Sequence, residues 1–214
     1  MTDSAQTSDA RPAFSRAERL ALADLLDELG PDQPTRCEGW STRDLAAHLV
    51  LRDRRPDAAA GFVLGGPFAA WTARAMAGAR RRPFPALVAA VRSGPPAWVP
   101  TSWPVVDRLL NTAEMAIHHE DVRRAQPDWT VRSLPRRAQD QLWSAVPFLG
   151  RGHEASPIPG GLAVRRSDVP ASTEGTRRQL RNGTPMTTVA GEPLEVLLWV
   201  SGRRDVARVE VTTG

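Results

Sequence analysis

The 214-residue sequence contains no tyrosine, no lysine, a single cysteine and four histidines. A single cysteine, Cys37, excludes a disulfide bond within the chain and is typical of a reducing compartment. Apolar runs of about 20 residues, the length needed to span a bilayer, are also absent. The first residues, MTDSAQTSDARP, are polar and contain no hydrophobic signal region. We therefore expect a cytoplasmic protein that does not enter a membrane.

Because lysine is absent, all 28 basic residues are arginine, and they exceed the 24 acidic residues by only four. The arginines are spread along the chain and interleaved with acids. A protein that binds nucleic acid through charge gathers its basic residues on one face, and the sequence shows neither such a stripe nor a recognition motif. We therefore rank a DNA-binding function last and expect no nucleic-acid partner.

Hydrophobic periodicity predicts a series of helices in the first two thirds of the chain. We expect helices over residues 15–29, 42–57, 83–92, 105–125 and 135–149, and short helical pieces around a turn within 61–78. Four or five helices joined by short loops favour an antiparallel bundle. A loop rich in proline, with Trp98 and Trp103, precedes the helix over 105–125. It either walls a pocket or is anchored by its packed indoles, and both readings stay open.

After Gly150 the composition changes. Residues 151–161, RGHEASPIPGG, are typical of a linker. Segments 161–166, 184–189 and 206–213 alternate or are rich in β-branched residues, which predicts short strands, and residues 192–203 predict a helix. The fold class is therefore α+β. We divide the chain into a flexible tail (1–13), a helical bundle (14–150) and a small α/β C-terminal domain (156–214).

The helix over 105–125 has polar groups on the face that its apolar residues turn toward the core. Glu114, Ile117, His118 and Asp121 recur at steps of three and four residues, so they share one face. Burying such polar groups is costly unless something satisfies them. A divalent metal would do so, because the spacing Glu114-x-x-x-His118 aims a carboxylate and an imidazole at one point.

A metal site on this helix needs a third donor from another element. His48 lies on a second predicted buried stripe, whereas His153 lies in the linker. His119 and Glu120 point away from His118 on the helix, so we interpret them as surface or packing residues. A lone buried histidine is usually an ordinary hydrogen-bonded imidazole. Spacing alone therefore leaves the metal site and this simpler reading equally open.

Other polar residues near His48 in the sequence are explained without a metal. Asp44 lies one turn before His48, but the sequence Ser41-Thr42-Arg43-Asp44 fits a helix-capping box, and we prefer that role. Cys37 could approach the metal, although we interpret it as a structural thiol in a turn. The charged residues from Arg52 to Asp57 are interpreted as a solvated face with local ion pairs.

The segments WSTRDLAAHL (40–49) and EMAIHHED (114–121) resemble the metal-binding domain of the mycothiol-dependent maleylpyruvate isomerase family, within the DinB-like superfamily. The longer strings CEGWSTRDLAAHLVLRDRRPDAA and NTAEMAIHHEDVRRAQP are similar to a metal-binding branch of that group. The resemblance implies an N-terminal DinB-like antiparallel four-helix bundle with a small C-terminal α/β domain. It also implies that the metal ligands are His48, Glu114 and His118.

The resemblance implies zinc as the metal, although two histidines and a carboxylate also suit nickel or iron(II). Three protein ligands leave a fourth position open, where zinc deprotonates a bound thiol. Family members hold mycothiol there as a thiolate that attacks an electrophilic carbon. Our first hypothesis is therefore a mycothiol-dependent thiol S-transferase or maleylpyruvate isomerase-like enzyme, acting on a small-molecule electrophile. The second is a non-enzymatic metal-binding or stress protein on the same scaffold. The oligomeric state stays open.

The resemblance implies catalytic roles for two further residues. Asp121 aligns with a family acid near the metal, which orients a ligand or handles a proton. Its alternative is an ion pair with Arg124 or Arg55. Arg203 aligns with a C-terminal arginine that reaches over the site and clamps a substrate carboxylate by paired hydrogen bonds. The adjacent Arg204 is the alternative for that role.

Overall fold

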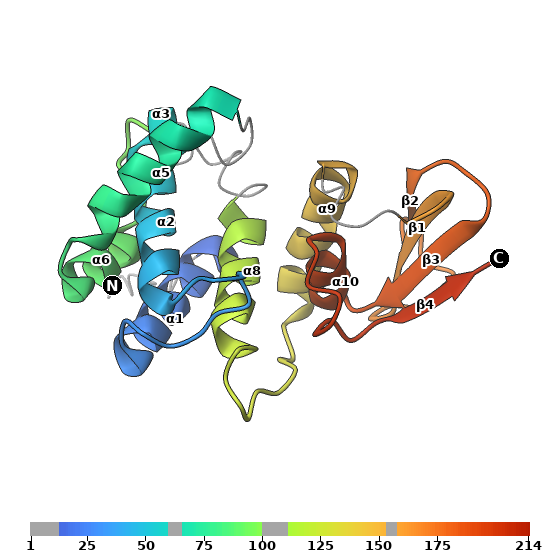
Figure 1. Ribbon diagram of the computed structural model, residues 1–214. Coiled ribbons are helices and arrows are strands. Elements are labelled where there is room, and N and C mark those ends of the chain that lie inside the picture. The colour runs from blue at the N-terminus through green and yellow to red at the C-terminus, as the bar shows by residue number, and fades with distance from the viewer. Residues whose placement is uncertain (1–12, 60–65, 100–110, 153–157) are drawn as a thin grey trace, which may run out of the picture.

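The computed structural model describes residues 13–59, 66–99, 111–152 and 158–214. Within these ranges the chain forms eight helices and four strands, so the predicted α+β class is confirmed. The helices are α1 (Phe14–Leu29), α2 (Thr42–Arg54), α3 (Pro56–Ala59), α5 (Gly66–Arg80), α6 (Phe84–Ser93), α8 (Thr112–Arg123), α9 (Arg136–Gly152) and α10 (Pro193–Val200). Figure 1 shows α9 and α10 between the other helices and the sheet.

Helix α2 begins where the sequence predicts a capping box. The Ser41 side chain accepts a hydrogen bond from the backbone of Asp44, and the Asp44 carboxylate accepts one from the backbone of Ser41, at 2.9 Å. Asp44 also pairs with Arg80 at the end of α5. The capping role of Asp44 is therefore confirmed, and the cap fixes the start of the helix that contains His48.

Three predicted helices have different bounds in the structure. The helix expected over 42–57 ends at Arg54, because Pro56 cannot continue its hydrogen bonding, and Pro56 begins α3 instead. Residues 66–80 form one helix, α5, rather than short pieces. The helix expected over 105–125 is described only from Thr112, and its predicted start lies outside the described residues.

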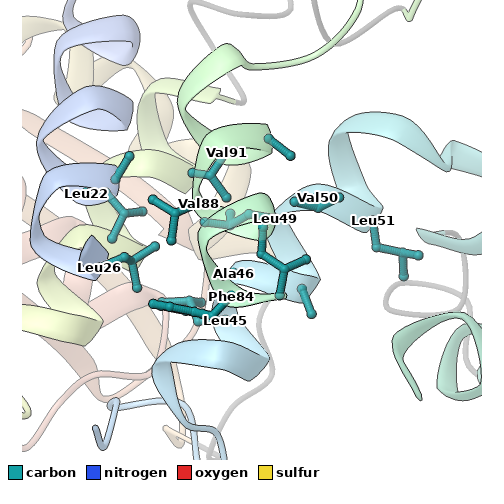
Figure 2. Close-up of a cluster of buried hydrophobic side chains, with 14 of the residues drawn as sticks. Leu22, Leu26, Leu45, Ala46, Leu49, Val50, Leu51, Phe84, Val88 and Val91 are labelled. Carbon is teal, nitrogen blue, oxygen red and sulfur yellow. The ribbon is translucent and has the colours of Figure 1, made fainter. Parts of the chain in front are cut away.

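The first hydrophobic core lies between α1, α2 and α6. Leu22 and Leu26 of α1 pack with Leu45 and Leu49 of α2, and Figure 2 shows this cluster. Burying each such leucine contributes about 1.5–3 kcal/mol. Met115 of α8 joins the same core. The core thereby fixes the positions of α2 and α8, the helices that contain the three predicted metal ligands.

A second core lies between α9, α10 and the sheet. It includes Leu142 and Val146 of α9, Leu194 and Leu198 of α10, and Ile117 from α8. Helix α8 therefore contributes to both cores, and α9 packs with the C-terminal part of the chain. The division of the chain into domains stays a prediction.

The sheet contains β1 (Gly161–Arg166), β2 (Arg177–Arg181), β3 (Met186–Gly191) and β4 (Glu210–Thr213), in the order β2-β1-β3-β4. The central pair β1–β3 is parallel, and both outer pairs are antiparallel. Strand β4 is shorter than the predicted segment 206–213. Strand β2 was not predicted, because its sequence RRQLR is mostly charged; charge is common on edge strands, where it discourages pairing with other chains. Among the described helices, none is long and apolar enough to cross a membrane.

Candidate metal centre

His48 of α2 meets Glu114 and His118 of α8 at one point. The Nε2 atom of His48 lies 3.2 Å from Oε1 of Glu114, and Nε2 of His118 lies 3.3 Å from the same oxygen. The three donor atoms all lie within 4.8 Å of one another. The two imidazole rings are 5.1 Å apart between centroids and meet edge to face. The structure therefore brings together the three residues that the sequence predicts as ligands.

These separations fit a tetrahedral metal ion. With metal–donor distances of about 2.0–2.1 Å, tetrahedral geometry places two donors about 3.3 Å apart. Both histidines turn Nε2, a common metal-binding atom of neutral imidazole, toward the carboxylate. Both histidines are 8% exposed, whereas the Glu114 side chain is 26% exposed. The donor set thus suits a divalent cation, and the carboxylate is its most exposed member.

The surroundings of two of the three donors favour the forms that bind metal, through charge at Glu114 and mainly through burial at His48. Burial raises the pKa of Glu114, but Arg52, His118 and His48 outweigh burial, so this pKa lies well below its ordinary value. Burial lowers the pKa of His48, and the nearby His118 adds to the effect. An ionised carboxylate and a neutral imidazole are the forms that bind metal.

Asp121 holds His118 from the side opposite the donor set. Its Oδ2 atom lies 2.9 Å from Nδ1 of His118, so that Nε2 is left to face Glu114. A carboxylate in this position orients a metal-binding histidine and raises its basicity. Burial lowers the pKa of His118, but Asp121 and the other close partners raise it well above its ordinary value. A cation bound here would therefore compete with a proton for His118.

Arg203 reaches the centre from the C-terminal part of the chain. Helix α10 ends at Val200, and Gly202, with φ of 95°, turns the chain toward α8. Arg203 donates from Nε and Nη2 to the two oxygens of Asp121, at 2.9 and 2.7 Å, and from Nη1 to the carbonyl of Ser201 at 2.7 Å. The paired hydrogen bond that the family resemblance implies for a substrate carboxylate is thus made to Asp121.

The alternative partners considered for these residues are engaged elsewhere. Arg124 pairs with Glu120 and Glu195, and Arg55 pairs with Asp57. The guanidinium of Arg204 lies over the Trp199 ring, 4.5 Å from its centroid. In the described part of the chain, Asp121 therefore pairs with Arg203 rather than with Arg124 or Arg55.

Cys37 lies closer to the centre than its interpretation as a turn thiol suggests. The backbone of Arg36 donates to the Asp121 carbonyl at 2.9 Å, which holds this loop against α8. Sγ of Cys37 then lies 3.2 Å from Oδ2 of Asp121 and 3.9 Å from Nδ1 of His118. These three residues form a second group of possible metal ligands. Arg203 bonds both oxygens of Asp121, and His118 bonds Asp121 through its Nδ1, so this group is already engaged and we assign Cys37 a supporting contact.

Arg52 is the second residue that sequence reasoning placed elsewhere. Its side chain is only 15% exposed, so it does not belong to a solvated face. Its Nε atom lies 3.3 Å from Oε1 of Glu114, and its Nη1 donates to Oδ1 of Asn111 at 2.7 Å. Arg52 follows His48 by four residues, so helical spacing puts both on one face of α2. That spacing was the signal that could have identified it.

His119 and Glu120 are buried, so of the two interpretations, surface or packing, only packing agrees with the structure. Nδ1 of His119 lies 2.9 Å from Oε2 of Glu18, and Arg132 bonds both Glu18 and Glu120. These residues form a separate polar network and are not part of the metal donor set. Of the two tryptophans in the proline-rich loop, Trp98 is described, and it is 69% exposed. The predicted linker residue His153 and the loop residue Trp103 lie outside the described residues.

Comparison with known proteins gives a likeness in fold. No family model matches the sequence, and no curated protein matches it. Solved structures that match include crystal structures of mycothiol-dependent maleylpyruvate isomerase and of its histidine-to-alanine mutant. Their TM-scores are both 0.59, with 18% and 16% sequence identity. Each match covers 93% of this chain and 90% of the isomerase chain. At this identity the likeness shows a shared fold.

Proposed function

We propose that this protein binds one divalent cation, by preference zinc, through His48, Glu114 and His118, and uses it to activate a low-molecular-weight thiol. We further propose that the thiol is mycothiol and that it attacks a small-molecule electrophile. The spacing of the three donor atoms, 3.2 and 3.3 Å about one carboxylate oxygen, carries the proposal. The fold shared with a mycothiol-dependent isomerase supports the choice of thiol.

A cation held there would supply an open coordination position at which a thiol loses its proton. The protein's own residues prepare that position. Asp121 keeps Nδ1 of His118 bonded and so holds Nε2 toward Glu114. Arg203 bonds both Asp121 oxygens and neutralises the buried carboxylate. Isomerase and transferase chemistry need the same ligands, so this donor set serves either reaction.

The same proposal extends to ancestry and location. Helices α1, α2, α6 and α8 would correspond to a DinB-like antiparallel four-helix bundle, and the chain would be a distant relative of the isomerase. The shared fold over 93% of the chain supports this relation. A reduced low-molecular-weight thiol belongs to the cytoplasm, and we propose that location for the protein.

A second candidate is a non-enzymatic metal-binding protein on the same scaffold. The hydrogen bonds of Arg203 favour it, because its paired donors are taken by Asp121 and not presented to a substrate. This candidate has the same donor set and the same cation. The two candidates differ in whether a thiol is consumed.

The first test is the metal content of the purified protein. We expect one cation per wild-type chain and a loss of at least about a hundredfold in affinity in His48→Ala, since one of three ligands is removed. His119→Gln is the control, because it changes the neighbouring buried histidine outside the donor set. Undiminished metal in His48→Ala would remove this histidine from the centre and refute the proposal.

The second test is thiol consumption by the metal-loaded protein with mycothiol and a panel of electrophiles. A thiol adduct identifies a transferase, whereas a rearranged product with unchanged thiol identifies an isomerase. If the protein binds the cation but turns over none of these pairs, the non-enzymatic candidate is favoured.

A further inference from the structure

Polar side-chain contacts between α2 and the N-terminal end of α8 extend beyond the three metal donors. His48 and Arg52 lie one turn apart on α2, whereas Asn111 directly precedes α8 and Glu114 lies in the first turn of that helix. Arg52 bonds Asn111 at 2.7 Å and approaches Oε1 of Glu114 at 3.3 Å. The carboxylate oxygen that faces both imidazoles therefore also faces a guanidinium.

A guanidinium at this place opposes the binding of a cation. Two positive charges a few ångströms apart in a partly buried site repel strongly enough to change a binding constant by about tenfold or more. The second arginine of the centre, Arg203, does not act in this way to the same degree, because its Nε and Nη2 both donate to Asp121. Arg52 also lies 3.6 Å from Oδ1 of Asp53, but that acid is already paired with Arg19. Both of these acids are balanced by their arginines, so with a divalent cation bound the positive charges of the cation and of Arg52 would exceed the remaining negative charge, that of Glu114. An anion at the open position would offset that excess.

We propose that Arg52 sets the charge of the metal centre so that it binds an anionic ligand, such as a thiolate, at the open coordination position. Arg52 weakens the hold on the cation and strengthens the hold on the anion. The inference rests on the metal-binding part of the proposed function and does not depend on turnover. It assigns Arg52 a positioning role, because its contact is with a ligand carboxylate.

The expected signs separate this role from a purely structural one. If Arg52 only tied α2 to α8, its removal would loosen Glu114 and weaken the binding of both cation and anion. If its charge is what matters, removal tightens the cation and weakens the anion. A lysine at the same place retains the charge but loses the planar fork.

The test uses full-length protein loaded with Co²⁺. Competition with a chelator gives the Co²⁺ affinity, and the visible absorption of the bound ion gives the affinity for thiocyanate, the anionic probe. We expect Arg52→Gln to bind Co²⁺ about tenfold more tightly and thiocyanate about tenfold more weakly than wild type. Arg52→Lys should stay within about threefold of wild type for both, because the charge is retained. Arg92→Gln removes an arginine from an exposed ion pair on α6 and should change neither.

Three outcomes would overturn the inference. Weaker binding of both ligands by Arg52→Gln would show a structural role, and thiocyanate affinity that stays unchanged would show no role in anion binding. A lysine variant that behaves like the glutamine variant would exclude charge as the cause. If Arg52→Gln does not fold, Arg52→Met is the second neutral variant and the same expectations apply. If wild type binds no Co²⁺, the proposed function fails together with the inference; in the other cases the metal centre stands.

Discussion

Helix α8 has a buried polar network on each of two faces; arginines pair with the acids of both, but the two networks differ in where their donor atoms point. In the network around His119, every acid has an arginine partner: Glu18 pairs with Arg132, and Glu120 and Glu195 both pair with Arg124. At the metal centre, two imidazole nitrogens and a carboxylate oxygen turn toward one point. Buried charge alone is therefore a poor sign of a binding site, whereas the convergence of donor atoms is a good one.

The paired network connects parts of the chain that are distant in sequence. Arg124 of the α8 terminus bonds both oxygens of Glu195 on α10, at 2.9 and 2.6 Å, and the carbonyl of Val206 at 2.7 Å. These bonds hold α10 against α8, and α10 leads directly to Arg203. We interpret the paired network as structural support and the converging donors as the centre that it supports.

The largest expected effect comes from breaking the paired network. Arg124→Ala should lower the free energy of unfolding by about 3–5 kcal/mol, because Glu120 and Glu195 lose a buried partner. Urea unfolding measures this loss. Arg123→Ala is the matched control; Arg123 is partly exposed and also pairs with Glu120, so its loss should cost less than about 1 kcal/mol. Equal losses in the two variants would contradict the structural role of Arg124. Folded Arg124→Ala should still bind one cation.

A smaller effect is expected from changing Asp121, the acid that orients the metal ligand His118. Asp121→Asn should weaken metal binding by about 10–100-fold, because the acid that orients and polarises His118 is lost. Chelator competition on the metal-loaded protein measures this change. Asp44→Asn is the control, since that acid caps α2 and should leave the metal affinity within about threefold of wild type. Comparable weakening in both variants would mean that neither acid has a specific role at the centre.

The smallest effect concerns how the free energy of unfolding decreases at acidic pH. Burial raises the pKa of Glu18, but hydrogen bonds from His119 and Arg132 outweigh burial and lower this pKa below its ordinary value of 4.5. Glu18 therefore contributes stability above about pH 4.5, and this contribution is lost as the pH falls through its lowered pKa. Glu18→Gln should flatten the fall in unfolding free energy below pH 4.5, measured by urea unfolding at several pH values. If the unfolding free energy of the variant fell with pH as steeply as that of wild type, Glu18 would not contribute to the loss of stability at acidic pH.

The parts of the fold that local sequence determines were predictable. The apolar period of α1 and the capping box at Ser41 depend on residues within one or two turns, and both appear in the structure. Strand β2 depends instead on its neighbour β1, because an Arg-rich strand gains its stability from pairing at the sheet edge. Its sequence alone contains no apolar alternation, so it could not be recognised.

At the candidate centre too, contacts between residues far apart in the sequence could not be predicted. The spacing of Glu114 and His118 and the buried stripe around His48 left a metal site and ordinary buried histidines equally open, and the family resemblance implied the three donors. Their meeting at one point depends on the packing of α2 against its neighbours. Cys37 lies beside them only because its loop is bonded to the carbonyl of Asp121, a contact between residues far apart in sequence. Helical spacing places Arg52 on the same face of α2 as His48, so its position could have been predicted. A charged residue near a helix end is usually solvated, however, and Arg52 is instead largely buried beside Glu114.

The reach of Arg203 has a consequence for synthesis on the ribosome. All three donors precede residue 120, whereas the guanidinium that neutralises Asp121 arrives only with the final turn after α10. A nascent chain that has completed α8 would therefore present the donors beside an unbalanced carboxylate. Such an intermediate would attract cations more strongly than the folded protein, and the segment after α10, which is translated later than α8, would balance the charge of Asp121.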